Sequence, residues 1–359
     1  MSMHQYICRA VFLFVFSPNL EAQDSKLPFY ADKSNLLILI EGNKERPIKT
    51  ESDWQKRRAH ILANMQLVMG PLPDESRKPP LEVEELEKKE LTKCIRKRIT
   101  FAVEHGDRVP AYLLIPKDLK DKAPAMLCLH QTTAIGKGEP AGVGSTKNLK
   151  YALELAERGY VTLAPDYPDF GDYKYDPYAH GYQSATMKGI WNHMRAIDLL
   201  QSLSEVDKDR IGCIGHSLGG HNTLFAAAFD PRIKVAVSSC GFTSFPKYYK
   251  GDLTGWSHKG YMPRIATEYG KDPKKMPFDF PEILAALAPR AVFINAPLHD
   301  DNFEVSGVKD CVNSAKPIFE LLKAKDKLTA EYPDCGHDFP EKVREAAYRF
   351  LDKNLKKEQ

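Results

Sequence analysis

The feature that most constrains the fold is a regular alternation of apolar runs and amphipathic segments from residue 123 onward. The apolar runs have the length and near-continuous hydrophobicity of strands buried in a parallel sheet. They occupy residues 123–130, 161–166, 210–215, 233–240, 290–297 and 328–334. Apolar side chains recur at helical spacing in residues 148–160, 184–203, 217–229 and 308–322, and in a last segment that ends at residue 355. This alternation predicts an α/β fold with a mostly parallel central sheet and helices on both faces.

The chain before residue 123 carries different patterns. Trp54, Ile61 and Met65 recur at helical spacing and predict a helix over residues 51–69, which the Gly and Pro residues of "GPLPDE" end. Residues 81–91 and 94–116 are typical of extended segments, with a hairpin turn at 105–107.

No internal repeat or low-complexity linker divides the chain after residue 81. We therefore expect one catalytic domain over residues 81–359, preceded by an N-terminal helical extension over residues 25–80. A chain of 359 residues is long enough to bury a substantial core.

The stretch "IGCIGHSLGGHN" places Ser217 among glycines, between an expected strand and an expected helix. In a G-x-S-x-G turn the missing side chains let a strand fold sharply into a helix, so that the serine hydroxyl is held exposed. A bland alternative is a tight turn in which the serine only caps the helix. A serine hydroxyl is a weak nucleophile, so catalysis would need a base and a group that orients the base. The loop after residues 290–297 supplies Asp300 and Asp301, and the loop after the last strand supplies His337.

Five motifs together resemble the α/β-hydrolases, close to the dienelactone-hydrolase and acetyl-xylan-esterase-like branch. They are "DKDRIGCIGHSLGG", "FINAPLHDDNF", "CGHDFP", "CLHQTT" and "APDYPDFG". The resemblance implies an α/β-hydrolase fold in which Ser217 is the nucleophile, His337 the general base and acid, and Asp300 the orienting carboxylate. It favours Asp300 over Asp301 because Phe303 then takes the place of an apolar anchor three residues later.

An oxyanion hole needs two N–H donors directed at the developing negative charge. One is expected from Leu218, the residue after the nucleophile, at the start of a helix. The second is expected from the "HQTT" loop, with Thr132 as the first choice and Gln131 as the second. His130 in that loop is interpreted as an internal hydrogen-bonding histidine rather than a base.

Trp256 and Tyr261 lie in a long insertion between two core strands. Aromatic faces suit sugar or aromatic groups, so both residues are candidates for substrate binding. The alternative is that they only pack the insertion onto the body of the protein.

The leading hypothesis is a serine hydrolase that cleaves carboxylic esters through an acyl-enzyme without a metal or organic cofactor. The resemblance points to short acyl esters, among them acetyl esters of glycans. One alternative is a peptidase of the prolyl-oligopeptidase type, although the chain has no room for a propeller domain. Another is an inactive hydrolase fold that binds a ligand, which labelling of Ser217 by a fluorophosphonate would distinguish. A metal site at His299, Asp300 and Asp301 is disfavoured because no second histidine lies at ligand spacing.

The charge pattern gives no indication of a nucleic-acid partner. The chain has 51 basic and 48 acidic residues, a net charge of +3, and no basic block with interleaved aromatic residues. A small-molecule or glycan ester is the expected partner, and the oligomeric state stays open. The seven cysteines show no C-x-x-C spacing; a bridge among Cys240, Cys311 and Cys335 is left open, with free thiols favoured.

Residues 1–24 have the order of a secretory signal peptide. Arg9 precedes an apolar run over residues 10–16, polar residues and Ala22 follow, and the run is too short to span a bilayer. Export to the periplasm or the medium is therefore expected, with a cytoplasmic protein that carries a disordered leader as the alternative.

Export predicts that the mature protein in its native host begins after roughly residue 22, because the signal peptidase removes the leader. N-terminal sequencing of the protein from the host checks this. Retention of Met1 would contradict it.

Overall fold

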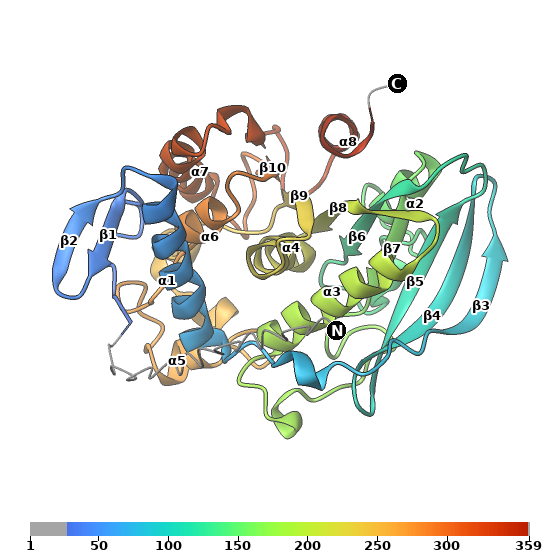
Figure 1. Cartoon of the computed structure of the whole chain (residues 1–359), viewed down its shortest axis with the longest axis horizontal. Coiled ribbons are helices and arrows are strands. Elements are labelled where there is room, and N and C mark those ends of the chain that lie inside the picture. Colours follow the sequence, from blue (N-terminus) through green and yellow to red (C-terminus); the bar gives the residue numbers. More distant parts are fainter. Residues whose placement is uncertain (1–26, 358–359) are drawn as a thin grey trace, which may run out of the picture.

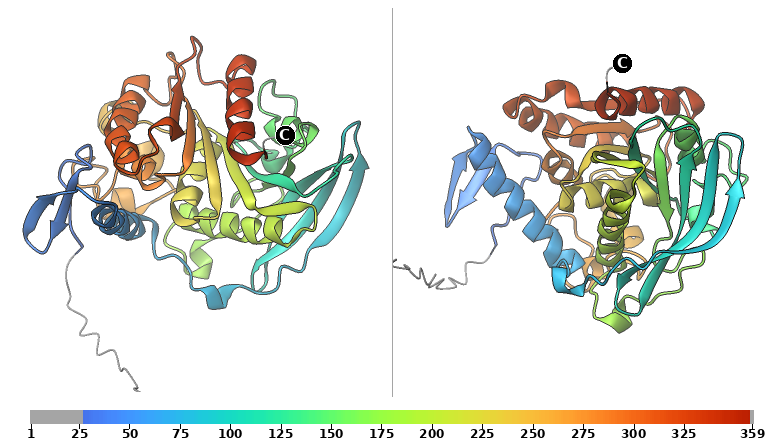
Figure 2. Two further views of the ribbon diagram at one scale, coloured as in Figure 1. Left: turned by 45° about the horizontal axis from the view of Figure 1, so that its top comes forward. Right: turned by 45° about the vertical axis from the view of Figure 1, so that its right-hand side comes forward.

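The computed structural model describes residues 27–357, so the expected leader over residues 1–24 lies outside the described residues. A nine-stranded sheet forms the centre of the molecule, in the order β11-β10-β9-β8-β6-β7-β5-β4-β3 (Figure 1). Its strands are β3 (Glu84–Glu90), β4 (Cys94–Glu104), β5 (Asp107–Pro116), β6 (Ala123–Leu129), β7 (Val161–Pro165), β8 (Val206–His216), β9 (Ile233–Ser239), β10 (Ala291–Asn295) and β11 (Leu328–Glu331). The six strands from β6 onward pair in parallel, whereas β3, β4 and β5 are antiparallel to their neighbours. Figure 2 shows these antiparallel strands, in cyan, curving away at one edge.

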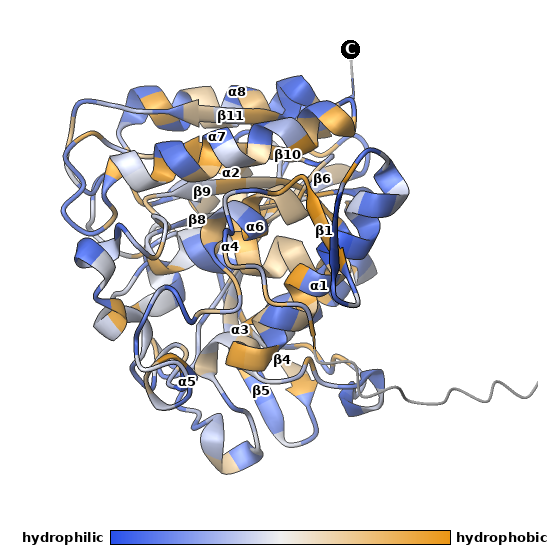
Figure 3. Ribbon diagram, turned by 90° about the vertical axis from the view of Figure 1, so that its left-hand side faces the viewer, coloured by the Kyte–Doolittle hydropathy of each residue, from blue (hydrophilic) through white to orange (hydrophobic). Residues whose placement is uncertain are grey.

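Helices cover both faces of the parallel part, because successive side chains of a strand point to opposite faces. On β6, Ala125 and Leu127 pack in one hydrophobic core, whereas Met126 and Cys128 pack in another. The first core lies against α3 (Ala185–Ser202), α4 (Leu218–Phe229), α6 (Phe280–Ala286) and α7 (Val305–Leu321). The second core lies against α2 (Tyr151–Glu157) and α8 (Glu341–Leu355). Figure 3 shows hydrophilic and hydrophobic bands along α7 and α8, as expected of helices with one face on the protein. The predicted fold class is confirmed.

The N-terminal part of the described chain shares the first of these cores. The helix α1 (Glu51–Met69) begins with a capping box between Thr50 and Asp53 and has the bounds that the sequence predicts. Trp54, Ile61 and Met65 of α1 are fully buried. The sequence analysis missed the two-stranded sheet of β1 (Ile38–Glu41) and β2 (Lys44–Pro47), so the extension is not helical alone. These strands have four residues each, which is too short for a periodic pattern to show.

The insertion between β9 and β10 contains α5 (Arg264–Thr267) and α6, neither of which the sequence analysis located. Of the described residues, no helix combines the length and apolar character needed to cross a membrane.

A buried ion pair joins α1 to α6, which lie side by side in Figure 1. Arg57 Nη2 lies 2.5 Å from Glu282 Oε1, and both side chains are fully buried. The Arg57 guanidinium also lies 3.0 Å from the centroid of the Tyr30 ring. Burial raises the pKa of Glu282 to about 7, and the charge of Arg57 opposes this rise. The pair therefore ties the N-terminal extension to the insertion between β9 and β10.

We expect Arg57→Met to lower the free energy of unfolding by about 3 kcal/mol at pH 8, because the buried Glu282 then loses the cation that contacts it directly. The loss should be smaller at pH 5. An acid whose pKa is raised in the folded state binds a proton on folding, so its unfavourable contribution grows as the pH rises. Urea unfolding at the two pH values measures both effects.

The matched control is Lys56→Met, which removes a half-exposed cation from the preceding position and should leave the stability nearly unchanged. The double variant Arg57→Met/Glu282→Gln should recover most of the stability at pH 8, because it leaves no buried carboxylate at position 282. An equal loss for Arg57→Met at both pH values would contradict the assignment.

Candidate active site

Ser217 lies in a strained turn between β8 and α4. Its backbone has φ 54° and ψ −117°, a conformation that L-residues rarely adopt. The Ser217 N–H donates to the carbonyl of Ser239 at the end of β9, over 2.8 Å. The turn thus presents the side chain of Ser217 at the carboxyl end of the parallel strands, where α/β sheets bind their ligands.

The glycines around Ser217 are required by close backbone approaches. A Cβ atom on Gly219 would lie 2.0 Å from the carbonyl oxygen of Leu129, and one on Gly220 would lie 2.7 Å from the carbonyl oxygen of Ser239. A Cβ atom on Gly215 would lie 2.2 Å from the Gly219 carbonyl oxygen. The start of α4 therefore packs directly on the ends of β6 and β9.

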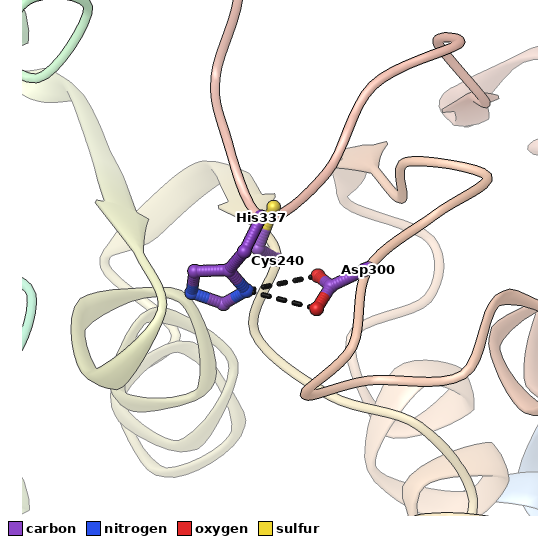
Figure 4. Close-up of side chains that lie close together, drawn as sticks. All are labelled: Cys240, Asp300 and His337. Carbon is purple, nitrogen blue, oxygen red and sulfur yellow. Dashed lines mark hydrogen bonds and ion pairs between the residues drawn. The ribbon is translucent and has the colours of Figure 1, made fainter.

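His337 and Asp300 meet at the same edge of the sheet, from the loops after β11 and β10 (Figure 4). His337 Nδ1 lies 2.9 Å from Asp300 Oδ1 and 3.0 Å from Asp300 Oδ2. Asp300 Oδ1 also accepts the backbone N–H groups of Asn302 and Phe303, at 2.9 and 3.0 Å. The carboxylate is thereby fixed, so it can orient the imidazole with Nε2 free for chemistry.

The neighbouring acid is placed differently. Asp301 is exposed and forms no hydrogen bond to His337 within the described chain, whereas Asp300 is 8% exposed. Phe303 is 7% exposed and packs in the main core, as the anchor that the sequence analysis assigned to it. Its burial turns the loop so that Asp300 points inward.

Asp300 stays ionised despite its burial. Burial opposes the charged form, but the hydrogen bond with His337, the charge of His337 and the two backbone N–H groups outweigh it. The pKa of Asp300 is consequently below its ordinary value. An ionised carboxylate on Nδ1 favours the Nδ1–H tautomer of His337 and stabilises the imidazolium.

His216, the last residue of β8, supports the ring of His337. The ring of His216 contacts the ring of His337 edge-on, with centroids 4.9 Å apart, and His216 Nδ1 lies 2.9 Å from the Ser239 hydroxyl. Burial and the nearby His337 lower the pKa of His216 to about 3, so His216 is a neutral support. No hydrogen bond joins Ser217 Oγ to His337 Nε2 in the part of the chain that the structure describes. Such bonds are often long in unliganded enzymes and tighten when substrate binds.

The two sides of the expected oxyanion hole lie together. Leu218 is the first residue of α4, and the approach of Gly219 to Leu129 sets it beside the loop that contains Gln131 and Thr132. His130 holds this loop, because its Nε2 accepts the Tyr167 N–H at 3.0 Å and its Nδ1 lies 2.6 Å from the Gln131 carbonyl oxygen. His130 thus has the hydrogen-bonding role that the sequence analysis assigned. The choice between Thr132 and Gln131 as second donor stays a prediction.

The two aromatic candidates, Trp256 and Tyr261, differ in how far their side chains are buried. Trp256 is 2% exposed and packs in the main core, where His221 and Phe280 contact its ring. Tyr261 is half-buried and packs beside Leu218. Tyr261, rather than Trp256, can therefore contact a ligand in this structure, and Trp256 supports it from behind at a ring distance of 5.8 Å.

Cys240 is a neighbour of the site that the sequence analysis did not identify as such. Ligand atoms of Cys240, Asp300 and His337 all lie within 4.8 Å of one another (Figure 4). Burial raises the pKa of the Cys240 thiol well above its ordinary value, so it is protonated, and Asp300 is occupied by His337 and two N–H groups. This chemistry does not suit a metal ion. Cys240, Cys311 and Cys335 are all free thiols in the structure.

Comparisons with known proteins find similarity to hydrolases and esterases. Residues 169–323 match the model of the family described as "Glucuronyl esterase, fungi". Over 312 residues the chain is 29% identical to the putative hydrolase YtaP of Bacillus subtilis, which covers 83% of this chain and all of that protein. It is 23% identical to the carbohydrate esterase MZ0003 of an unknown prokaryotic organism, over 83% of this chain and 80% of that one.

Solved structures give the same result for the fold. A glucuronoyl esterase from Solibacter usitatus superposes with a TM-score of 0.71 and 21% identity, over 92% of this chain and all of that chain. Acetyl xylan esterase 1 from a Thermoanaerobacterium species superposes with a TM-score of 0.58 and 18% identity, over 84% of this chain and 94% of that chain. The sheet order, the strained serine turn and these similarities together show an α/β-hydrolase fold, and the chain is similar to esterases that share this fold.

Proposed function

We propose that this protein is a serine hydrolase that cleaves carboxylic esters through an acyl-enzyme. The observation that carries the proposal is the fixed Asp300–His337 pair, which lies at the same sheet edge as the strained turn of Ser217. A paired acid and imidazole at the same sheet edge as a partly exposed serine are parts that acyl transfer requires.

The reaction proceeds in two halves. His337 Nε2 takes the proton of Ser217 Oγ as the oxygen attacks the ester carbonyl, and Asp300 stabilises the resulting imidazolium. The tetrahedral intermediate places its negative oxygen at the N–H of Leu218 and at a second donor, Thr132 or Gln131. Collapse breaks the bond to the alcohol oxygen, which takes the proton from His337. A water molecule then attacks the acyl-enzyme by the same route and releases the acid. Each step uses only protein groups and water.

The substrate class in this proposal is an ester of a glycan. Its support is the similarity to proteins named carbohydrate esterase, glucuronoyl esterase and acetyl xylan esterase. These names describe two kinds of ester: one with a short acyl group on a sugar hydroxyl, the other with the carboxyl group of the sugar itself. We further propose that Tyr261 contacts the substrate and that the protein is exported, where such glycans are found.

The first test is a panel of nitrophenyl acetate, an acetylated xylo-oligosaccharide and the methyl ester of glucuronic acid. The wild-type protein should hydrolyse nitrophenyl acetate and at least one of the two sugar esters. Ser217→Ala should abolish both activities, because the remaining groups cannot form an acyl-enzyme. Unchanged turnover in folded Ser217→Ala protein would refute the mechanism. A wild-type protein that hydrolyses no ester and does not react with a fluorophosphonate would instead be a binding protein.

The second test compares two adjacent acids. Asp300→Asn should lower turnover of nitrophenyl acetate by several hundred-fold or more, because the imidazole loses the carboxylate that fixes its tautomer; the equivalent replacement in a serine protease costs about 10⁴-fold. Asp301→Asn removes an exposed charge and should stay within about tenfold of the wild type. Steady-state kinetics of the two folded variants decide the assignment. The reverse order of losses would transfer the role to Asp301.

A further inference from the structure

Three hollows adjoin one another on the side of the sheet where the catalytic loops lie. The first, of about 430 Å³, lies between the loop after β7 and the residues Lys259 and Gly260. The second, of about 340 Å³, lies between the β4–β5 turn and η1 (Glu75–Arg77). The third, of about 200 Å³, continues from that turn to Pro79 and Pro80.

Shared residues connect the three hollows. Tyr175 lines both the first and the second, and Glu104, His105 and Gly106 line both the second and the third. In Figure 1 the light-green loop around η3 (Tyr178–His180) and the blue-cyan segment of η1 lie below α3, and both line this depression. The hollows are therefore neighbours along the surface, and we call the three together the Tyr175 groove.

One end of the Tyr175 groove adjoins residues that pack beside the candidate catalytic centre. Ala185 and Gly260 line the first hollow, and Ala185 packs in one cluster with Tyr167 and Leu218. Tyr261, the proposed substrate contact, follows Gly260 directly and packs on the same cluster. The Tyr167 hydroxyl donates to the Gly260 carbonyl over 3.0 Å and fixes this junction. A chain that lies in the groove would thus extend away from the residue next to Ser217.

The walls of the groove carry cationic and anionic side chains in nearly equal numbers. The first hollow has two cations, Lys174 and Lys259, and two anions, Asp169 and Asp176. In the second hollow Arg77 faces two acids, Glu104 and Asp107, whose charge a buried lysine also balances. Sugar hydroxyls donate and accept hydrogen bonds, so a balanced set of this kind suits a neutral glycan better than a polyanion.

Aromatic rings complete the wall at the junction of the first two hollows. Tyr175 stacks between Tyr173 and His180, with ring centroids at 5.4 and 4.5 Å and interplanar angles of 18° and 20°. His180 is exposed, so it offers the outer face of this stack. A flat ring face at the side of a groove is a contact that the apolar face of a sugar ring can use.

The floor of the groove is rigid. Lys188 is fully buried, and its Nζ lies 2.6 Å from Glu104 Oε2 and 2.6 Å from Asp107 Oδ2. The Tyr173 hydroxyl donates to Asp107 at 2.9 Å. Side chains that are held in place before binding lose little entropy when a ligand arrives, which favours a binding surface of this kind.

We propose that the Tyr175 groove binds an uncharged stretch of the glycan chain that carries the ester, so that the enzyme acts on oligomeric or polymeric glycans rather than on single sugars. This inference rests on the proposed esterase function. Binding along the groove contributes affinity away from the reacting bond, and it should lower KM with little effect on kcat.

The test uses acetylated xylo-oligosaccharides of two to six sugar units, with nitrophenyl acetate as a substrate too small to occupy the groove. For the wild type, KM should fall by about tenfold or more between the shortest and the longest sugar. In the double variant Arg77→Ala/His180→Ala this dependence on length should disappear, since two contacts with exposed side chains are lost. The kcat/KM for nitrophenyl acetate should stay within about twofold of the wild type.

The matched control is Arg349→Ala, which removes an exposed arginine from α8 on the other face of the sheet and should keep the dependence on length. The proposed binding role of the groove would be wrong if KM did not depend on oligosaccharide length in the wild type, or still depended on it in the double variant. Either result would leave the proposed esterase function unaffected. If the wild type hydrolyses no ester, the proposed function fails instead. Calorimetric titration of the Ser217→Ala protein with unesterified xylohexaose then tests binding in the groove independently of catalysis. A heat of binding that disappears when Arg77→Ala/His180→Ala is added supports the groove. If the Ser217→Ala protein shows no heat of binding, the groove is refuted.

Discussion

The candidate site depends on how closely the first turn of α4 approaches the ends of β6 and β9. Gly219 and Gly220 lie so near the carbonyl groups of Leu129 and Ser239 that no side chain would fit at either position. This contact accompanies the unusual backbone of Ser217 and sets the start of α4 beside the end of β6 and the loop that follows it. A site built on a turn that packs against two buried strands has little freedom to relax. Rigidity of this kind is what the stabilisation of a short-lived oxyanion requires.

Burial divides the histidines near the site into supports and one reactive group. His130, His216 and His221 are almost fully buried, and burial lowers the pKa of each of them. A buried imidazole is disfavoured in its charged form, so these rings serve as neutral packing and hydrogen-bonding groups. The side chain of His337 is 22% exposed and contacts the fixed carboxylate of Asp300. In the proposed mechanism, His337 is the ring that receives a proton from Ser217 and passes it to the leaving group.

Buried ion pairs join separate segments of the chain at two places around the site. Arg57 and Glu282 join the N-terminal extension to the insertion that contains Trp256, and Lys188 joins Glu104 to Asp107 below the Tyr175 groove. Each pair removes charge from water, so its stability depends on good geometry and on further hydrogen bonds. Their contribution to function is to keep the walls of the site in one arrangement.

The sequence by itself determined the local structure and the order of the chemical groups. Helical spacing predicted the bounds of α1, the turn at 105–107 follows from its glycine, and the glycines around Ser217 indicated a sharp strand-to-helix turn. The resemblance to α/β-hydrolases favoured Asp300 over Asp301 because it gave Phe303 the place of an apolar anchor, and Phe303 is buried in the structure. Only the tertiary structure decided what depends on contacts between distant segments. It buried Trp256 behind Tyr261, set Cys240 beside Asp300 and His337, and joined the β4–β5 turn, η1 and the loop after β7 into one groove. Spacing along the chain encodes which face of an element is buried, but the packing of the whole molecule determines which buried faces meet.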